Sequence, residues 1–246
     1  MILSGCGVDK RMDGLKILAV DSSSMTGSVA LCCDEVLVAE SLLNVRSTHS
    51  EKLLQQIDLL LNQAGWQLAD LDFFVVVTGP GSFTGLRIGI ATVKGLAQVA
   101  DKPVAPVSSL QTIAMNLPLS PYPVCAFLDA RKQEVYTQLF EWDRNLGPIA
   151  CGESAVLPPQ QVLDALTGDV TFVGDGVLSY RQLIDDCLGI RAHFPAAPAH
   201  QLRASHAAWL GLKMWQTGQT QSAADIVPTY IRPSDAELNL SHKRNS

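Results

Sequence analysis

A glycine-rich turn between an apolar strand and a long helical segment is the feature that most limits the fold of this chain. The turn, residues 79–89, reads GPGSFTGLRIG and follows the apolar run Phe73–Thr78. A buried strand that leads through such a turn into a helix is typical of layered α/β proteins. It also directs free backbone N–H groups and the positive end of a helix dipole at one place, as in anion sites. A candidate nucleotide or phosphate loop is therefore predicted here, made up of Gly79, Gly81, Ser82, Thr84 and Gly85.

Three common glycine motifs do not match this turn. A P-loop requires Lys after its last glycine, where Leu86 stands. A dinucleotide fingerprint requires a third glycine where Thr84 stands, and a nucleophile elbow requires serine where Phe83 stands. The alternative explanation is packing, because Gly85 and Gly89 are four residues apart and would let the helix approach the sheet closely.

Composition and charge limit the partners that the chain can have. Its 246 residues are 47% hydrophobic and 17% charged, as in an ordinary globular protein. The formal net charge is −6, and Lys and Arg cluster only near residues 242–244, so a nucleic acid would be bound through another subunit. The six cysteines include no C-x-x-C pair, which indicates reduced thiols in a cytoplasmic protein. No run approaches the roughly 20 apolar residues of a membrane span.

Two similar units follow one another along the chain. Residues 15–21 form a predicted strand that ends in Asp21, and further strands return over residues 27–33 and 36–42. Another predicted strand ends in Asp129, and a strand over residues 134–142 returns. This repeated unit predicts an internally duplicated α/β fold. We expect an extension over 1–14 that is disordered or foreign to the native chain, an N-terminal lobe over 15–116, a C-terminal lobe over 117–232 and a tail over 233–246.

Periodicity predicts the remaining elements. Strands are expected over residues 73–78, 103–107 and 171–173. Helices are expected over residues 48–64, 84–100, 158–166, 178–187 and 204–216, with another near residue 108.

The glycine turn and the repeated strand–Asp units resemble the TsaB (YeaZ) family of bacterial tRNA threonylcarbamoyladenosine biosynthesis proteins. The resemblance spans about residues 16–232 and is most specific over residues 79–89. It implies the fold of the actin-like ATPase (ASKHA) superfamily, in which two ribonuclease-H-like lobes face each other across a cleft. Each lobe would be a mixed sheet flanked by helices. Further matching segments are residues 17–23, 27–31, 49–53, 129–136 and 228–232.

The resemblance implies that the chain is a non-catalytic scaffold or activating subunit. It would be required for forming the threonylcarbamoyl group on adenosine 37 of tRNAs that read codons beginning with adenine. The implied partners are the metal-dependent transferase TsaD and the ATPase TsaE, with tRNA met only through the complex. TsaD relatives bind their metal through H-x-x-x-H, and here Ser109 and Ile113 stand where those histidines would fall. Neither side chain can replace an imidazole ligand. No metal, no catalytic residue and no intrinsic cofactor are expected, and nucleotide binding is expected only in the complex.

The predicted helices over residues 48–64 and 84–100 carry more apolar side chains than one core contact needs. Either both of their sides are buried within the chain, or one side meets another protein. The resemblance favours a TsaD heterodimer in which these helices pair with their equivalents, and a homodimer through the same surface when TsaD is absent. The predicted partner-binding residues are Leu53, Leu54, Ile57, Leu61, Leu86, Ile90, Val93 and Ala97.

Two other functions stay open at this point. Asp21 and Asp129 stand where the resemblance places carboxylates that hold nucleotide-bound Mg²⁺, which would suit an actin-like ATPase or transferase. The alternative for both is a turn-forming aspartate at a strand end. Ser82 or Thr84 could be the nucleophile of a peptidase, but no neighbouring residue supplies a base.

Overall fold

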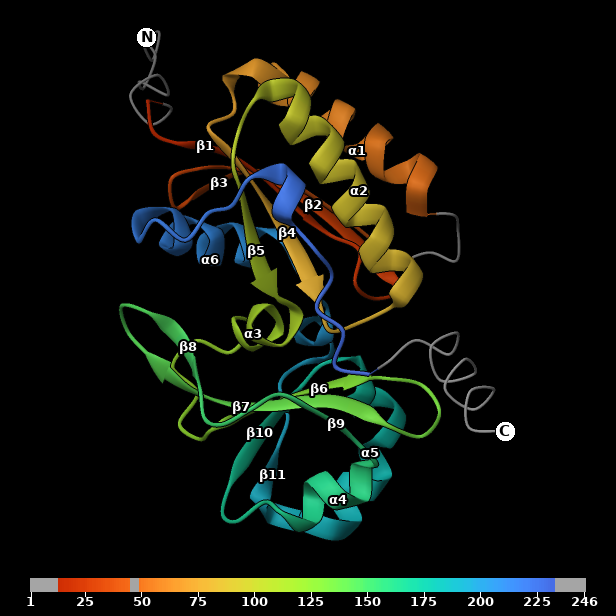
Figure 1. Cartoon of the computed structure of the whole chain (residues 1–246). Coiled ribbons are helices and arrows are strands. Elements are labelled where there is room, and N and C mark those ends of the chain that lie inside the picture. The colour runs from red at the N-terminus through yellow and green to blue at the C-terminus, as the bar shows by residue number, and fades with distance from the viewer. Residues whose placement is uncertain (1–12, 45–48, 233–246) are drawn as a thin grey trace, which may run out of the picture.

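The computed structural model describes residues 13–44 and 49–232 and shows two lobes, one above the other (Figure 1). The rest of the predicted N-terminal extension, residues 1–12, and the predicted tail, residues 233–246, lie outside the described residues. No helix in the described part is long and apolar enough to cross a membrane. The predicted class, α/β with two mixed sheets flanked by helices, is confirmed.

The upper lobe is a five-stranded mixed sheet with helices on both faces. Its elements are β1 (Lys16–Asp21), β2 (Thr26–Cys33), β3 (Val36–Asn44), α1 (His49–Ala64), η2 (Leu68–Asp70), β4 (Phe73–Gly79), α2 (Phe83–Ala100), β5 (Val104–Ser108), α6 (Ala204–Gln216) and η5 (Ala223–Asp225). The strand order is β3-β2-β1-β4-β5, with β1 antiparallel to β2 and parallel to β4. Helices α1 and α2 cover one face and α6 covers the other (Figure 1). Because both faces are covered, β1, β2 and β4 are buried along nearly their whole length, and β1 and β4 are continuous apolar runs.

The lower lobe repeats the sheet with shorter strands. Its elements are α3 (Ser109–Ala114), β6 (Val124–Asp129), β7 (Val135–Asp143), β8 (Gly147–Ala150), β9 (Ala155–Leu157), α4 (Pro159–Asp164), β10 (Val170–Val173), α5 (Asp175–Leu188), η3 (Gly189–Arg191), β11 (Ala192–His193) and η4 (Ala197–His200). The main strand order is β11-β10-β6-β7-β8, and β9 also pairs with β7. Helices α4 and α5 cover one face, while α3 packs between this sheet and the upper lobe. The predicted duplication is confirmed, since β1–β2 and β6–β7 are matching hairpins that begin with a strand ending in Asp.

Three short strands and one helix start were not predicted. β8, β9 and β11 have two to four residues and are largely half-exposed, so they carry no periodic apolar signal. α5 begins at Asp175 rather than at residue 178. The two glycines beside Asp175 suggest a loop, yet a Cβ at Gly176 would lie only 2.8 Å from the Phe127 carbonyl oxygen, so glycine is needed for packing.

Helix α6 lies within the segment assigned from sequence to the C-terminal lobe, but it packs on the sheet of the upper lobe. Four of the six buried residues of α6 are alanine or glycine, so its axis approaches the strands closely. At Gly211, an added Cβ would lie 2.3 Å from Val75 Cγ2 in the middle of β4. The chain therefore returns to complete the first lobe after building the second.

The apolar stripes on α1 and α2 face the chain's own core, which corrects the predicted partner-binding residues. Six of the eight are buried between the helices and the sheet, and Leu61 packs against that cluster. Leu61 is partly buried, and of the eight only Leu54, at 51%, counts as exposed. Helices that cover a sheet need a full face for that contact alone. The buried six are Leu53, Ile57, Leu86, Ile90, Val93 and Ala97.

Two glycine-to-alanine changes inside helices should have opposite effects on stability. At Gly211 the new methyl would overlap the Val75 side chain, so we expect Gly211→Ala to lower the free energy of unfolding by about 1–3 kcal/mol. At Gly95 in α2 nothing lies within 4 Å of an added Cβ, so Gly95→Ala should raise it by about 1 kcal/mol through helix propensity.

Urea denaturation of both variants beside the parent chain measures these two free energies. If Gly211→Ala does not lower the free energy of unfolding, α6 does not sit as close to β4 as described.

Candidate functional site

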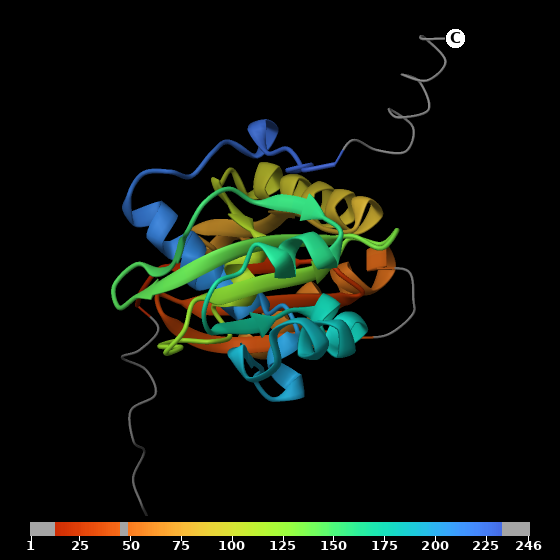
Figure 2. The same cartoon turned by 90° about the horizontal axis from the view of Figure 1, so that it is seen from below.

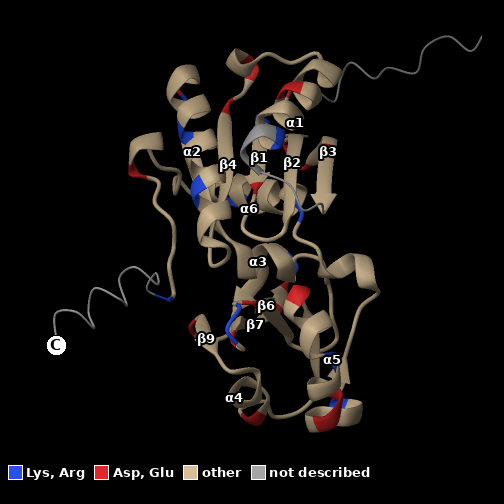
Figure 3. Ribbon diagram, turned by 90° about the vertical axis from the view of Figure 1, so that its right-hand side faces the viewer, with Lys and Arg blue, Asp and Glu red and all other residues tan. Residues whose placement is uncertain are grey.

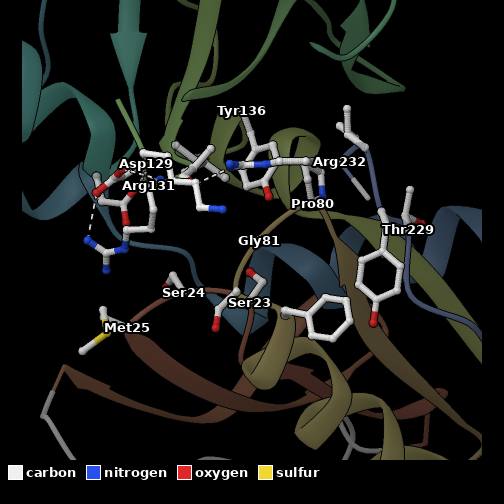
Figure 4. Close-up of a pocket in the computed structure, with 18 residues that line it drawn as sticks. Ser23, Ser24, Met25, Pro80, Gly81, Asp129, Arg131, Tyr136, Thr229 and Arg232 are labelled. Carbon is white, nitrogen blue, oxygen red and sulfur yellow. Dashed lines mark hydrogen bonds and ion pairs between the residues drawn. The ribbon is translucent and has the colours of Figure 1, made fainter. Parts of the chain in front are cut away.

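A pocket of about 460 Å³ opens between the two lobes (Figure 4). It is bounded by the turn after β1, the glycine turn, the β6–β7 turn, the start of α5 and a C-terminal segment. Figure 4 shows Ser24 and Met25 on one side and Thr229 and Arg232 on the other. The predicted site residues that line it are Gly81, Ser82 and Asp129. The end of the upper sheet thus faces the end of the lower one across this pocket.

The glycine turn packs directly on the β1–β2 turn. A Cβ at Gly81 would lie 2.3 Å from the Ser23 carbonyl oxygen, and a Cβ at Gly85 would lie 2.0 Å from the Ser22 carbonyl oxygen. The Ser22 hydroxyl donates to the Gly85 carbonyl oxygen at 2.8 Å. The packing explanation, left open by the sequence, therefore accounts for these two glycines.

Two amides of the turn, those of Ser82 and Gly85, are bonded within the chain. The Ser82 amide donates to the Ser23 carbonyl oxygen at 2.7 Å. The Gly85 amide donates to Ser82 Oγ at 3.3 Å, so this hydroxyl caps α2. Thr84 is exposed on the first turn of α2, and Gly79 ends β4 beneath the C-terminal segment. A phosphate at this turn would compete with these intrachain acceptors.

The two positions where the resemblance places metal-binding histidines are occupied by structural contacts. Ser109 Oγ donates to the Pro80 carbonyl oxygen, which fastens α3 to the glycine turn. Ile113 is fully buried in the core between α3 and the lower sheet. Within residues 13–44 and 49–232, no group of three or more His, Cys, Asp or Glu side chains could hold a metal ion.

Asp21 is a fully buried carboxyl at the end of β1. Its Oδ1 accepts from the Ser23 amide at 2.9 Å, and its Oδ2 has no hydrogen-bond partner among the described residues. Burial raises the pKa of Asp21 from 3.8 to about 6, and the charge of Asp175 adds to the rise, while contacts from Ser23 oppose it. Such a perturbed carboxyl beside a pocket is a candidate functional group.

Two further carboxyls lie on the lower-lobe side of the pocket. Asp129 pairs with Arg131, its Oδ2 lying 3.0 Å from Arg131 Nη1. Asp175 accepts from the Asp129 amide at 3.0 Å, and burial raises the pKa of Asp175. Sequence reasoning missed Asp175, which begins α5 two residues after β10 ends, whereas Asp21 and Asp129 are the last residues of their strands. The structure therefore brings two strand-end carboxyls and one helix-start carboxyl to one region.

Comparison with known proteins decides the family. The chain is 32% identical over 228 residues to the tRNA threonylcarbamoyladenosine biosynthesis protein TsaB of Bacillus subtilis. The matched region covers 91% of this chain and 96% of that protein. It is also 32% identical to the Escherichia coli TsaB over 237 residues, 93% of this chain and 100% of that protein. The chain belongs to the TsaB family. A family model described as TsaD, tRNA N6-adenosine threonylcarbamoyltransferase, matches residues 43–240.

Solved structures agree with this membership. The structure titled YeaZ from Pseudomonas aeruginosa is 29% identical, has a TM-score of 0.75, and covers 88% of this chain and 99% of that one. The ethanolamine utilization protein EutJ from Carboxydothermus hydrogenoformans has a TM-score of 0.51 at 10% identity, over 79% of this chain and 89% of that one, and shows the fold alone. The resemblance to the TsaB family and the actin-like fold that it implied are confirmed.

The buried carboxyl of Asp21 should make the stability of the chain depend on pH. Because its folded pKa is above its unfolded value, the native state loses stability as pH rises from about 4 to 7. Asp21→Asn removes this loss and keeps an acceptor for the Ser23 amide. We expect the free energy of unfolding of the variant, relative to the parent, to rise by on the order of 2–3 kcal/mol across this range.

Denaturation at several pH values measures this difference, and Asp143→Asn is the matched control. Amide donors from Leu146 and Asn145 lower the pKa of the exposed Asp143 carboxyl, so its contribution has the opposite sign and is lost as pH falls. A difference between Asp21→Asn and the parent that stays constant with pH would contradict the buried, destabilising carboxylate.

Proposed function

We propose that this chain is a non-catalytic, cytoplasmic subunit of the complex that forms threonylcarbamoyladenosine in tRNA, and that it binds and activates TsaD. TsaE would be the third member of the complex. Membership in the TsaB family supports the pathway, and the match to the TsaD family model supports a partner of similar fold. The observation that carries the docking proposal is the exposed apolar face of α1 and α2.

The docking face consists of side chains that the core does not use. Leu54 on α1 is 51% exposed and Val99 on α2 is 80% exposed. On α2, Gly95 and Val99 are four residues apart and lie on the side away from the buried stripe. Gly95 has open space above it. A partner helix could approach closely there and bury the leucine and valine.

The absence of catalysis is proposed on the contacts at the pocket. Ser109 and Ile113 fasten α3, and the Ser82 and Gly85 amides of the glycine turn are bonded within the chain. Asp129 is engaged by Arg131. A nucleotide would therefore bind only after the partner has reshaped this region. TsaD would carry the reacting atoms.

Contact with tRNA is proposed to be indirect. The formal net charge is −6. In the view of Figure 3 the Lys and Arg positions are scattered over both lobes, without the broad basic face that phosphate binding needs.

The same docking face on α1 and α2 would serve a homodimer in the absence of TsaD.

Glutamate at both exposed positions should abolish binding to TsaD. In Leu54→Glu/Val99→Glu, carboxylates face the partner's apolar surface, so we expect the Kd to rise at least about a hundredfold. Both side chains are exposed, so the Tm should stay near that of the parent. Isothermal titration with TsaD measures the Kd, and a reconstituted reaction with TsaD, TsaE and tRNA should lose product in parallel.

Ile190→Glu is the matched control, because Ile190 is 94% exposed on the lower lobe, away from the docking face. It should bind TsaD as the parent does. Undiminished binding by the double variant would exclude this face, and the molar mass of the chain alone would show whether the same substitutions also split a homodimer.

The second candidate function, an actin-like ATPase, is favoured by the three carboxyls near the pocket. If the chain hydrolyses ATP by itself, turnover with Mg²⁺ should be abolished by Asp21→Asn. Under the proposed function we expect no turnover by the chain alone, and threonylcarbamoylation in the reconstituted reaction should survive Asp21→Asn. Phosphate release by the chain alone that disappears in this variant would favour the ATPase.

A further inference from the structure

After η5 the chain passes from the upper lobe to the lower lobe. We call this segment, residues 226–232, the strap. Figure 2 shows the chain running along α2 before it reaches the strap. Ile226 is buried in the core beneath α2. Lys94 Nζ donates to the carbonyl oxygens of Ala224 at 2.8 Å and Ile226 at 3.0 Å. The beginning of the strap is therefore fixed to the upper lobe.

The middle of the strap lies on the glycine turn. The Thr229 amide donates to the Thr78 carbonyl oxygen at 2.8 Å, which extends the hydrogen bonding at the end of β4. Gly79 has a positive φ of 127°, and a Cβ there would lie 2.6 Å from the Thr229 carbonyl oxygen. Glycine at this position thus gives the strap room to pass.

Tyr230 attaches the strap to the first turn of α2. Its ring stacks on that of Phe83, with 4.6 Å between the ring centroids. Its hydroxyl accepts from Arg87 Nε at 3.2 Å, and the Arg87 guanidinium also lies over the Phe83 ring. Tyr230 remains 39% exposed, so this attachment lies at the surface.

Arg232 attaches the end of the strap to the lower lobe. Its guanidinium pairs with Glu134 at 2.9 Å and donates to the Ala130 carbonyl oxygen, so it holds both ends of the β6–β7 turn. The residues between have positive φ values of 61°, 52° and 60°, which side chains other than glycine adopt at a cost. These residues are Arg131, Lys132 and Gln133.

We propose that the strap is a clasp between the lobes, closing one side of the interlobe pocket and able to open while both lobes stay folded. Residues 229–232 form one wall of that pocket (Figure 4). The buried beginning of the strap acts as its hinge side. Its outer end is held by the Tyr230 ring stack, by the ion pair and hydrogen bond of Arg232, and by Ile231, which is partly buried against the lower-lobe core. The ring stack and the ion pair are individually weak contacts. Detachment of that end is a local opening and does not require loss of either core.

Opening should be measurable at Tyr136, which lines the pocket beside Arg232 (Figure 4). In Tyr230→Ala/Arg232→Ala, hydroxyl-radical footprinting with mass spectrometry should show several-fold faster oxidation of Tyr136. Buried Trp66 in the upper lobe should oxidise as in the parent. Hydrogen exchange should quicken by about tenfold in peptides over residues 129–136 and stay unchanged in α5.

Val227→Ala is the matched control, since Val227 is in the same strap and is 67% exposed. It should leave the oxidation of Tyr136 and the exchange over residues 129–136 at the parent's values. If Tyr136 is oxidised equally in the double variant and the parent, the strap does not close the pocket. If exchange quickens throughout both lobes, the strap is part of the cooperative core, and the clasp is also rejected.

Discussion

The close approach of α2 to the β1–β2 turn is the contact on which the rest of the upper lobe depends. Only glycine at positions 81 and 85 lets the Ser22 and Ser23 backbone lie against the start of the helix. This contact orders the turn whose Ser23 amide bonds Asp21, and it leaves the outer side of the glycine turn for the C-terminal segment. One small region thus joins a strand end, a hairpin turn, a helix start and the chain's last described segment.

Much of this architecture could be predicted because its signals are local. The apolar run of β4, the glycine turn and the strand–Asp units each fit within about ten residues, and together they define the duplicated sheet. The side of a helix that meets the core is a harder question. Leu53 and Leu54 are neighbours of equal hydrophobicity, yet one is buried and the other is half exposed, because the position of the sheet decides between them.

The site shows the same division between local and long-range information. Asp21 and Asp129 were identified from their strands, whereas Asp175 was missed because its flanking glycines resemble a loop. The residue pairs that define the pocket come from distant parts of the sequence, such as Arg232 with Glu134 and Tyr230 with Phe83. No periodicity in a single sequence encodes contacts between such distant residues, so these pairs could be identified only from the fold.

The return of α6 to the first sheet has a consequence for how the chain is made. Its small residues complete the second face of a sheet whose strands all precede residue 109. A ribosome therefore releases the whole lower lobe before the upper sheet is covered on both sides. Until residues 204–216 emerge, the apolar face of β1 and β4 is exposed to solvent and to chaperones. The lobe that begins first along the chain is the last to be finished.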